Sequence, residues 1–333
     1  MRVIRLFKLA FAGLLLGGVA AAAWLFHFAL TPVEVPAEAR EITVKKGRSL
    51  RGVGLDLVAA GVLGEPWSFV WMTRLLGQAG AVKAGNYELP AQITPYRLLE
   101  MIARGRVSQA QITFIEGWTF TQMRAALAAH PGVTHDIGTL SDTEVLRAIG
   151  ASEMHPEGLF FPDTYYFSPG THELKILTRA YHTLQARLNA LWTTRAPGLP
   201  YRSPYEALIM ASIVEKETGL EADRKMIAAV FVNRLRRNMR LQTDPTVIYG
   251  LGSTFDGNLR KVDLEADTPY NTYTRTGLPP TPIALPGQSA LEAALQPAMT
   301  PALYFVARGD GSSHFSDNLD DHNRAVRRYQ LGR

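Results

Sequence analysis

The sequence SPYEALIMASIVEKETG, residues 203–219, decides how the larger part of the chain is organised. It opens with Ser203-Pro204-Tyr205-Glu206, the pattern of a capping box with proline at the first helical position. The next residues, 207–214, are apolar nearly all the way round a helix, which predicts that this helix is buried. We expect Gly219 to end the helix as its C-terminal cap.

Two glutamates, Glu215 and Glu217, come at the end of this helix. A carboxyl group there has apolar neighbours and faces the negative end of the helix dipole, and both effects raise its pKa. A glutamic acid with a raised pKa can donate a proton near neutral pH. The alternative is that both side chains emerge at the helix end and pair with Lys216, Arg224 or Lys225.

Helical spacing separates these two glutamates. On an α-helix, Glu215 and Glu217 point about 200° apart around the axis. They cannot both line one cleft as an acid and nucleophile pair unless the helix unwinds. If the chain cleaves a glycosidic bond, it therefore uses one of the two carboxyl groups, and spacing alone does not choose which.

The composition excludes several kinds of protein. Of the 333 residues, 47% are hydrophobic and 20% are charged, which is typical of one large or two modest globular domains. There is no cysteine, which excludes disulfide frameworks, thiolate nucleophiles and cysteine-ligated zinc. A net charge of +5 without any nucleic-acid-binding motif predicts no nucleic-acid partner.

The N-terminus predicts the compartment. Residues 9–30 carry no Asp, Glu, Lys or Arg and are long enough for a helix to cross a bilayer. Because basic residues precede them and glutamates follow, we expect a cytoplasmic tail at 1–8, a single-pass anchor at 9–30, a linker at 31–40 and an exported remainder. The alternative is a cleaved signal peptide with its cleavage site near Ala20–Ala23, but apolar residues continue past that site.

Residues 41–106 have the pattern of a small α+β subdomain. Ile42 and Val44 alternate with polar residues as in a strand, and short capped helices follow. The segment ITVKKGRSL, residues 42–50, resembles LysM glycan-binding modules. A small domain that only packs against its neighbour would show the same pattern, so glycan binding and packing both remain open.

An aromatic stretch, EGLFFPDTYYF, covers residues 157–167. Clusters of aromatic residues usually lie in a core. Here Glu157 and two tyrosines are interleaved with them, which also suits sugar recognition by stacking and hydrogen bonding.

Several long motifs occur in one order along the chain. They are ASIVEKETG at 211–219, MRLQTDPTVIYG at 239–250, YNTY at 270–273, GLPP at 277–280, ALPG at 284–287 and HFSDNLDDHN at 314–323. With the single N-terminal anchor and the EGW segment at 116–118, this set resembles the endolytic murein transglycosylases of the YceG-like family, over nearly the whole chain.

The resemblance implies an α+β fold with a LysM-like subdomain at 41–106 and a larger mixed α/β catalytic domain at 107–333, on the outer face of the bacterial inner membrane. It implies that the catalytic residue is the second glutamate of the E-K-E pair, which is Glu217 here. It also implies peptidoglycan glycan strands as substrate and cell-wall synthases such as penicillin-binding proteins as partners.

The chemistry of such an enzyme needs one carboxylic acid. The C6 hydroxyl of N-acetylmuramic acid attacks its own anomeric carbon, so neither water nor a nucleophilic residue is required. Glu217 would protonate the leaving glycosidic oxygen and then take the proton of that hydroxyl, giving a 1,6-anhydro end. No cofactor is expected.

Polar residues of the later motifs are the substrate-binding candidates. Together with Glu157 they are Gln242, Thr243, Asp244, Tyr249, Tyr270, Asn271, Thr272 and Tyr273. The first three suit sugar hydroxyl and acetamido groups or the orientation of Glu217, the tyrosines suit ring stacking, and Asn271 suits donation to an N-acetyl carbonyl. Turn formation is the alternative for each, because Asp-Pro and Asn-Thr are common in loops.

Three other hypotheses compete with the transglycosylase: a hydrolase, a glycan-binding scaffold and a zinc site. A hydrolase would use Glu217 with Asp244 as the second carboxylate. A non-catalytic, membrane-tethered scaffold would bind glycan and recruit synthases. His314 and His322 lie near aspartates, but their spacing matches no zinc motif, so we expect no metal site.

Overall fold

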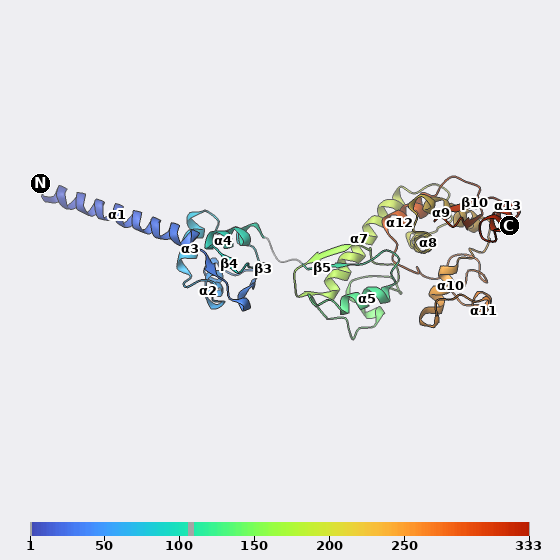
Figure 1. Cartoon of the computed structure of the whole chain (residues 1–333), viewed down its shortest axis with the longest axis horizontal. Coiled ribbons are helices and arrows are strands. Elements are labelled where there is room, and N and C mark those ends of the chain that lie inside the picture. Colours follow the sequence, from blue (N-terminus) through green and yellow to red (C-terminus); the bar gives the residue numbers. More distant parts are fainter. Residues whose placement is uncertain (1, 106–109, 333) are drawn as a thin grey trace. The chain divides into compact units, whose positions relative to one another are not determined.

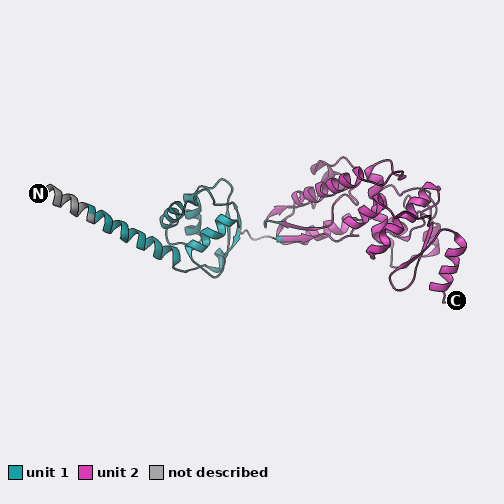
Figure 2. Ribbon diagram, turned by 90° about the horizontal axis from the view of Figure 1, so that it is seen from above, with its two compact units in different colours: residues 1–110, 167–169 teal, residues 111–166, 170–333 magenta. Residues whose placement is uncertain are grey.

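The computed structural model describes residues 2–105 and 110–332 (Figure 1). The chain divides into two compact units, residues 1–110 with 167–169 and residues 111–166 with 170–333 (Figure 2). The predicted domain boundary between residues 106 and 107 lies outside the described residues.

The first unit begins with one long apolar helix, α1 (Arg2–Leu30). Its segment Gly13–Leu30 has a mean hydropathy of 1.8 and is long enough to cross a membrane, a criterion that a signal sequence also meets. Near its end, Leu25, Phe28 and Ala29 pack against the core of this unit.

The rest of the first unit is a small α+β structure around one apolar core. Strand β2 (Glu41–Val44) pairs antiparallel with β3 (Gly85–Glu88), and β1 (Val33–Glu34) pairs antiparallel with β4 (Gln92–Ile93). The helical elements are η1 (Ala37–Ala39), α2 (Leu50–Ala59), α3 (Trp67–Leu75) and α4 (Pro95–Arg104).

The prediction of short capped helices in this unit is confirmed. The side chain of Ser49 accepts a hydrogen bond from the Gly52 amide at the start of α2, and Thr94 caps α4 in the same way. Pro66 is the N-cap residue of α3. The Glu65 carboxylate accepts from the Trp67 amide at 2.6 Å and so defines the first turn.

The second unit is built mainly from helices. They are α5 (Phe120–Ala128), α6 (Asp142–Ala148), α7 (Glu173–Thr193), α8 (Pro204–Glu217), α9 (Glu221–Arg236), α10 (Asp244–Leu251), η2 (Gly252–Thr254), α11 (Lys261–Glu265), α12 (Gln288–Leu295) and α13 (Leu319–Tyr329).

Its strands form only two-stranded sheets among the described residues. These are β5 (Ala110–Thr113) with β7 (Thr164–Phe167), β6 (Val133–Thr134) parallel to β8 (Thr171–His172), and β9 (Tyr304–Ala307) antiparallel to β10 (Ser313–Ser316). The mixed α+β class is confirmed. The strands do not, however, join into one large sheet, so the α/β character expected of this unit is confined to short strand pairs.

Helix α8 lies at the centre of the second unit, and the prediction that it is buried is confirmed. Residues 207–214 are all buried, and the helix packs against α7, α9, α10 and α12. The one hydroxyl in this run, on Ser212, donates to the Ile209 carbonyl and accepts from the Ile283 amide, so burial leaves it paired.

Both ends of α8 differ in detail from the prediction. Ser203 caps the helix, but the Glu206 carboxylate turns to the Arg202 amide at 2.6 Å, so the reciprocal half of the capping box is missing. The helix ends at Glu217 because Thr218 adopts an extended backbone, with φ of −148° and ψ of 136°. Gly219 is therefore not the cap, and the prediction that it caps the helix was wrong.

Candidate active site

The carboxyl group of Glu217 lies at the C-terminal end of α8 and accepts a hydrogen bond from the hydroxyl of Thr243. Burial raises the pKa of Glu217 to about 7, and the nearby charge of Asp244 acts in the same direction. The Thr243 hydroxyl and the charge of Arg234 oppose this by stabilising the carboxylate. Glu217 can therefore give and take a proton near neutral pH.

A short network of threonines positions Thr243. Its amide donates to the hydroxyl of Thr272 at 3.0 Å, and the hydroxyls of Thr272 and Thr246 lie 2.9 Å apart. Thr246 also donates to the Thr243 carbonyl at 2.8 Å. All three residues are buried, so the network fixes the residue that contacts Glu217 and leaves Thr272 no direct access to a ligand.

The guanidinium of Arg234 holds the chain segment around Thr243 by hydrogen bonds. Its Nη1 donates to the carbonyl of Leu241 at 2.9 Å and to Gln242 Oε1 at 3.3 Å, and its Nε donates to the Leu303 carbonyl at 2.7 Å. Arg234 is buried, and it comes from α9, next to α8 in the chain. One cation thus joins α9, the segment before α10 and the start of β9.

Further polar groups come from Gln242 and Asp244, on either side of Thr243 in the chain, and from Tyr273. Gln242 and Asp244 are exposed, and the Tyr273 hydroxyl donates to Asp244 Oδ1 at 2.5 Å. Gln242 has a φ of 53°, a left-handed conformation that is uncommon for a residue other than glycine. The bond from its amide to the Thr272 carbonyl, at 3.1 Å, helps to hold that conformation.

Glu215 has different partners. Its carboxylate accepts from the Gly287 amide at 2.9 Å and pairs with Arg224 at 3.3 Å. Burial raises the pKa of Glu215, while the Gly287 amide and Arg224 lower it. Its ion pair with Arg224 follows the alternative that the sequence left open, whereas Glu217 contacts Thr243. Glu215 therefore joins the end of α8 to the start of α12.

A second buried carboxyl group, Glu157, lies at the other end of α10. It accepts from the Phe120 amide at 3.0 Å and from the Tyr249 hydroxyl at 3.1 Å, and burial raises its pKa to about 7. The Tyr249 ring packs edge-on against Tyr270, whose hydroxyl lies 2.9 Å from that of Thr281. Both tyrosines are only partly buried, and their hydroxyl groups are held by protein.

The side chain of Asn271 makes its hydrogen bonds within the protein. Its side chain is fully buried, and its amide donates to the carbonyls of Asp263, Leu264 and Ala266. Its Oδ1 accepts from the Tyr273 amide at 2.8 Å. Asn271 therefore closes the loop that carries Tyr273 and has no amide hydrogen left for an N-acetyl group.

Comparison with known proteins identifies the family of this chain. Residues 42–328 match the model of the YceG-like family. The chain belongs to the YceG-like family. A crystal structure of a YceG-like protein from Listeria monocytogenes aligns with a TM-score of 0.55 and 31% identity, covering 88% of this chain and 98% of that one.

Two relatives of this YceG-like chain carry a functional name. An endolytic murein transglycosylase of Bacillus subtilis is 34% identical over 320 residues, covering 90% of this chain and 88% of the relative. An endolytic murein transglycosylase of Streptococcus pneumoniae is 26% identical over 319 residues, covering 86% of this chain but only 57% of the relative.

Two supporting residues of this YceG-like site were not among the candidates from the sequence. Thr246 completes the threonine network, and Arg234 holds the segment around Gln242. The signal for Arg234 was a cation two residues after the apolar run of residues 227–232, where a buried helix face would place it. Within residues 2–105 and 110–332, no group of three His, Cys, Asp or Glu is arranged to hold a metal ion.

Proposed function

We propose that this chain is an endolytic murein transglycosylase, which cleaves the β-1,4 bond between N-acetylmuramic acid and N-acetylglucosamine within glycan strands without using water. The observation that carries the proposal is Glu217, a single carboxyl group with a pKa of about 7, held by a hydroxyl group in a family whose relatives bear this name. Such a strand-cutting activity would trim or terminate new glycan strands.

Glu217 acts first as an acid and then as a base. In its protonated form it donates to the leaving glycosidic oxygen as the anomeric bond breaks. The resulting carboxylate takes the proton of the C6 hydroxyl of the same sugar, which closes the 1,6-anhydro ring. Because the nucleophile belongs to the substrate, correct positioning of the sugar replaces a second catalytic carboxylate.

The neighbouring residues divide into positioning and contact groups. Thr243 orients the Glu217 carboxyl, and Arg234 with Thr272 holds the segment from Leu241 to Thr243. Gln242, Asp244 and Tyr273 offer the groups that contact the sugar. Tyr249 and Tyr270 extend the binding surface along α10 with their rings as stacking surfaces, and the buried Glu157 holds the Tyr249 hydroxyl.

The apolar helix α1 serves as a retained anchor with its N-terminus in the cytoplasm. Its Leu25, Phe28 and Ala29 pack on the first unit, which supports a helix that stays attached after export. Residues 1–8 then form the tail, 9–30 the span and 31–40 the linker in the inner membrane. Residues 41–106 form the LysM-like subdomain, and residues 107–333 form the catalytic domain outside the membrane. Synthases that make glycan at this membrane, such as penicillin-binding proteins, are the expected neighbours.

One observation favours a hydrolase as the second candidate. The charge of Asp244 contributes to the raised pKa of Glu217, so a second carboxylate acts at the same site. In a hydrolase, Asp244 would activate water or stabilise the cation. Against this, Asp244 already accepts from the Tyr273 hydroxyl at 2.5 Å.

Digestion of isolated glycan strands by the full-length protein in detergent tests the proposal. The strands should shorten by internal cuts, so that their length distribution falls before single disaccharides appear. Glu217→Gln should abolish shortening, with Glu206→Gln, a half-buried glutamate at the other end of α8, as the control. Strands that stay intact with the folded wild-type protein would favour the non-catalytic scaffold.

A further inference from the structure

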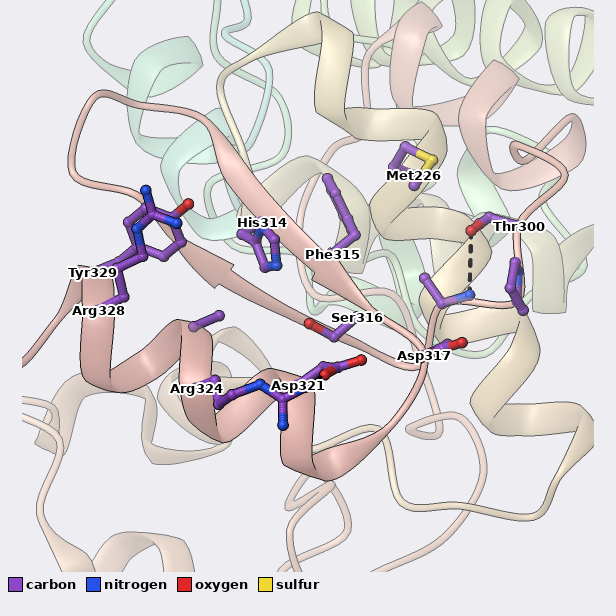
Figure 3. Close-up of a pocket in the computed structure, with 13 residues that line it drawn as sticks. Met226, Thr300, His314, Phe315, Ser316, Asp317, Asp321, Arg324, Arg328 and Tyr329 are labelled. Carbon is purple, nitrogen blue, oxygen red and sulfur yellow. Dashed lines mark hydrogen bonds and ion pairs between the residues drawn. The ribbon is translucent and has the colours of Figure 1, made fainter.

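A cavity of about 640 Å³ lies between strand β10 and helix α13 in the second unit (Figure 3). Strand β10 contributes His314, Phe315 and Ser316, and α13 contributes Arg324 and Arg328. The volume is within the range of pockets that hold small molecules. None of the residues proposed above for glycan binding or catalysis lines it.

The wall of the cavity carries charges of both signs. Arg324 is paired with Asp321, which neutralises both. Arg328 is exposed and lies over the ring of Tyr329, 5.3 Å from its centroid, and this ring contact leaves its charge uncompensated. Asp317 is exposed on the opposite side, and within the described residues its carboxylate accepts a hydrogen bond from the Asn318 amide group alone. A cationic and an anionic group are thus available to a ligand.

The floor of the cavity contains an unsatisfied polar atom. Ser316 is 6% exposed, and its hydroxyl oxygen has no hydrogen-bond partner among residues 2–105 and 110–332. Figure 3 shows this side chain on β10, on the side that faces α13. A buried hydroxyl without a partner is costly, and a ligand that donates to it or accepts from it would remove the cost.

The cavity is also connected to the catalytic segment. His322 of α13 stacks on Tyr304 of β9, with ring centroids 5.1 Å apart. The guanidinium of Arg234 lies 5.1 Å from the same Tyr304 ring and holds Gln242 beside Glu217. Arg234 therefore contacts both the Tyr304 ring, on which His322 of α13 stacks, and the segment before α10.

From these features we infer that the β10–α13 cavity binds the peptide that substitutes the glycan, through a carboxylate at Arg328 and Ser316 and an ammonium group at Asp317. This rests on the proposed function, because it names a further part of the same substrate. A cavity wall with one cationic and one anionic group suits a short peptide that carries both a carboxylate and an ammonium group. A polyanion such as a phosphate group would meet Asp317 and Asp321, and uncharged glycan would leave Arg328 unused.

Cleavage of two substrates by the full-length protein in detergent tests this inference. One is peptide-bearing glycan strands, and the other is the same strands stripped of peptide by an amidase. Arg328→Gln combined with Ser316→Ala should lower kcat/KM on peptide-bearing strands roughly 10-fold, as expected for losing a charged hydrogen bond. Activity on stripped strands should not change. Arg327→Gln is the matched control, because Arg327 is exposed on the same helix and does not line the cavity.

Equal activity of the double variant and the wild type on peptide-bearing strands would overturn the inference, and so would an equal loss on both substrates. If the wild type cleaves neither substrate, the proposed function fails, and calorimetry still decides the cavity's role. There the free tripeptide L-alanyl-γ-D-glutamyl-diaminopimelate should bind the wild type and bind the double variant roughly 10-fold more weakly. Displacement of the tripeptide by equimolar inorganic phosphate, or unchanged binding in the double variant, would also overturn it.

Discussion

Glu215 and Glu217 lie two residues apart on α8, yet their carboxyl groups have no hydrogen-bond partner in common. Glu215 accepts from the Gly287 amide and pairs with Arg224, whereas Glu217 accepts from the Thr243 hydroxyl. Helical periodicity directs them to different sides of α8. Glu215 holds the start of α12 in place, and Glu217 is the residue to which we assign the proposed chemistry.

This difference predicts opposite results for two matched substitutions. Glu217→Gln should reduce kcat by about 10³-fold or more while the melting temperature changes little, because the proton donor is lost. Glu215→Gln should keep most of the activity but lower the free energy of unfolding by about 1–3 kcal/mol, because Arg224 loses its buried carboxylate. Activity and thermal unfolding of both variants check this. An inactive Glu215→Gln with an active Glu217→Gln would reverse the assignment.

The pKa of Glu217 predicts the pH dependence of catalysis. Its folded pKa is raised from 4.5 to about 7, and the reaction starts from the protonated form. The rate should therefore be highest below pH 7 and should fall about tenfold per pH unit well above it. A kcat profile on purified glycan strands measures this. A rate that rises through pH 7 would mean that Glu217 starts the reaction as a base.

Thr243→Val should move that profile. The hydroxyl of Thr243 lowers the pKa of Glu217 against the effect of burial, so its loss should shift the descending limb to higher pH. The rate at pH 6 should fall about tenfold, because the carboxyl group loses its orientation. The exposed Thr193 serves as the control, and Thr193→Val should leave both the rate and the limb unchanged. If the descending limb does not shift in Thr243→Val, the Thr243 hydroxyl does not affect the pKa of Glu217.

Arg234→Met tests the clamp between β9 and the segment before α10. It removes donors to Leu241, Gln242 and Leu303, so the free energy of unfolding should fall by about 2–4 kcal/mol. The positive charge also lowers the pKa of Glu217, so the activity remaining should persist to higher pH. If Arg234 has a purely structural role, Arg234→Met will lower the free energy of unfolding without moving the descending limb of the pH–rate profile.

Glu157 predicts how stability depends on pH. Burial raises its folded pKa from 4.5 to about 7, so the folded state binds its proton more tightly than the unfolded state does. The stabilisation that Glu157 gives the folded state is fully present below about pH 4.5 and is lost as the pH rises through 7. The melting temperature should fall from pH 5 to 8, and Glu157→Gln should reduce that fall. The same slope in wild type and variant would show that Glu157 does not contribute.

Much of this architecture could be predicted from local sequence, and the exceptions have physical reasons. The burial of residues 207–214 follows from their apolar pattern, and the cap at Ser203 follows from its position before a proline. The end of α8 did not follow, because Thr218 rather than Gly219 leaves the helical conformation. A glycine permits a left-handed cap, but tertiary contacts decide whether one forms.

The active site, too, could be predicted only in part from local sequence. The sequence could identify Glu217 only together with a family resemblance, because helical spacing treats it and Glu215 alike. It could not separate Asn271 from the exposed Asp244, since both lie in polar loop motifs. Asn271 became a structural residue through three backbone carbonyls that only the folded loop brings together. The contacts of Arg234 join residues up to 69 positions apart, which no local pattern reveals.

The mass of the new strand ends tests the central claim most directly. Purified glycan strands are digested with the full-length protein, and the fragments are analysed by mass spectrometry. The single-carboxylate account predicts 1,6-anhydro ends, one water lighter than hydrolysed ends, for the wild type and for Asp244→Asn alike. Reducing ends that carry the added water, and that disappear in Asp244→Asn, would contradict it and identify a two-carboxylate hydrolase.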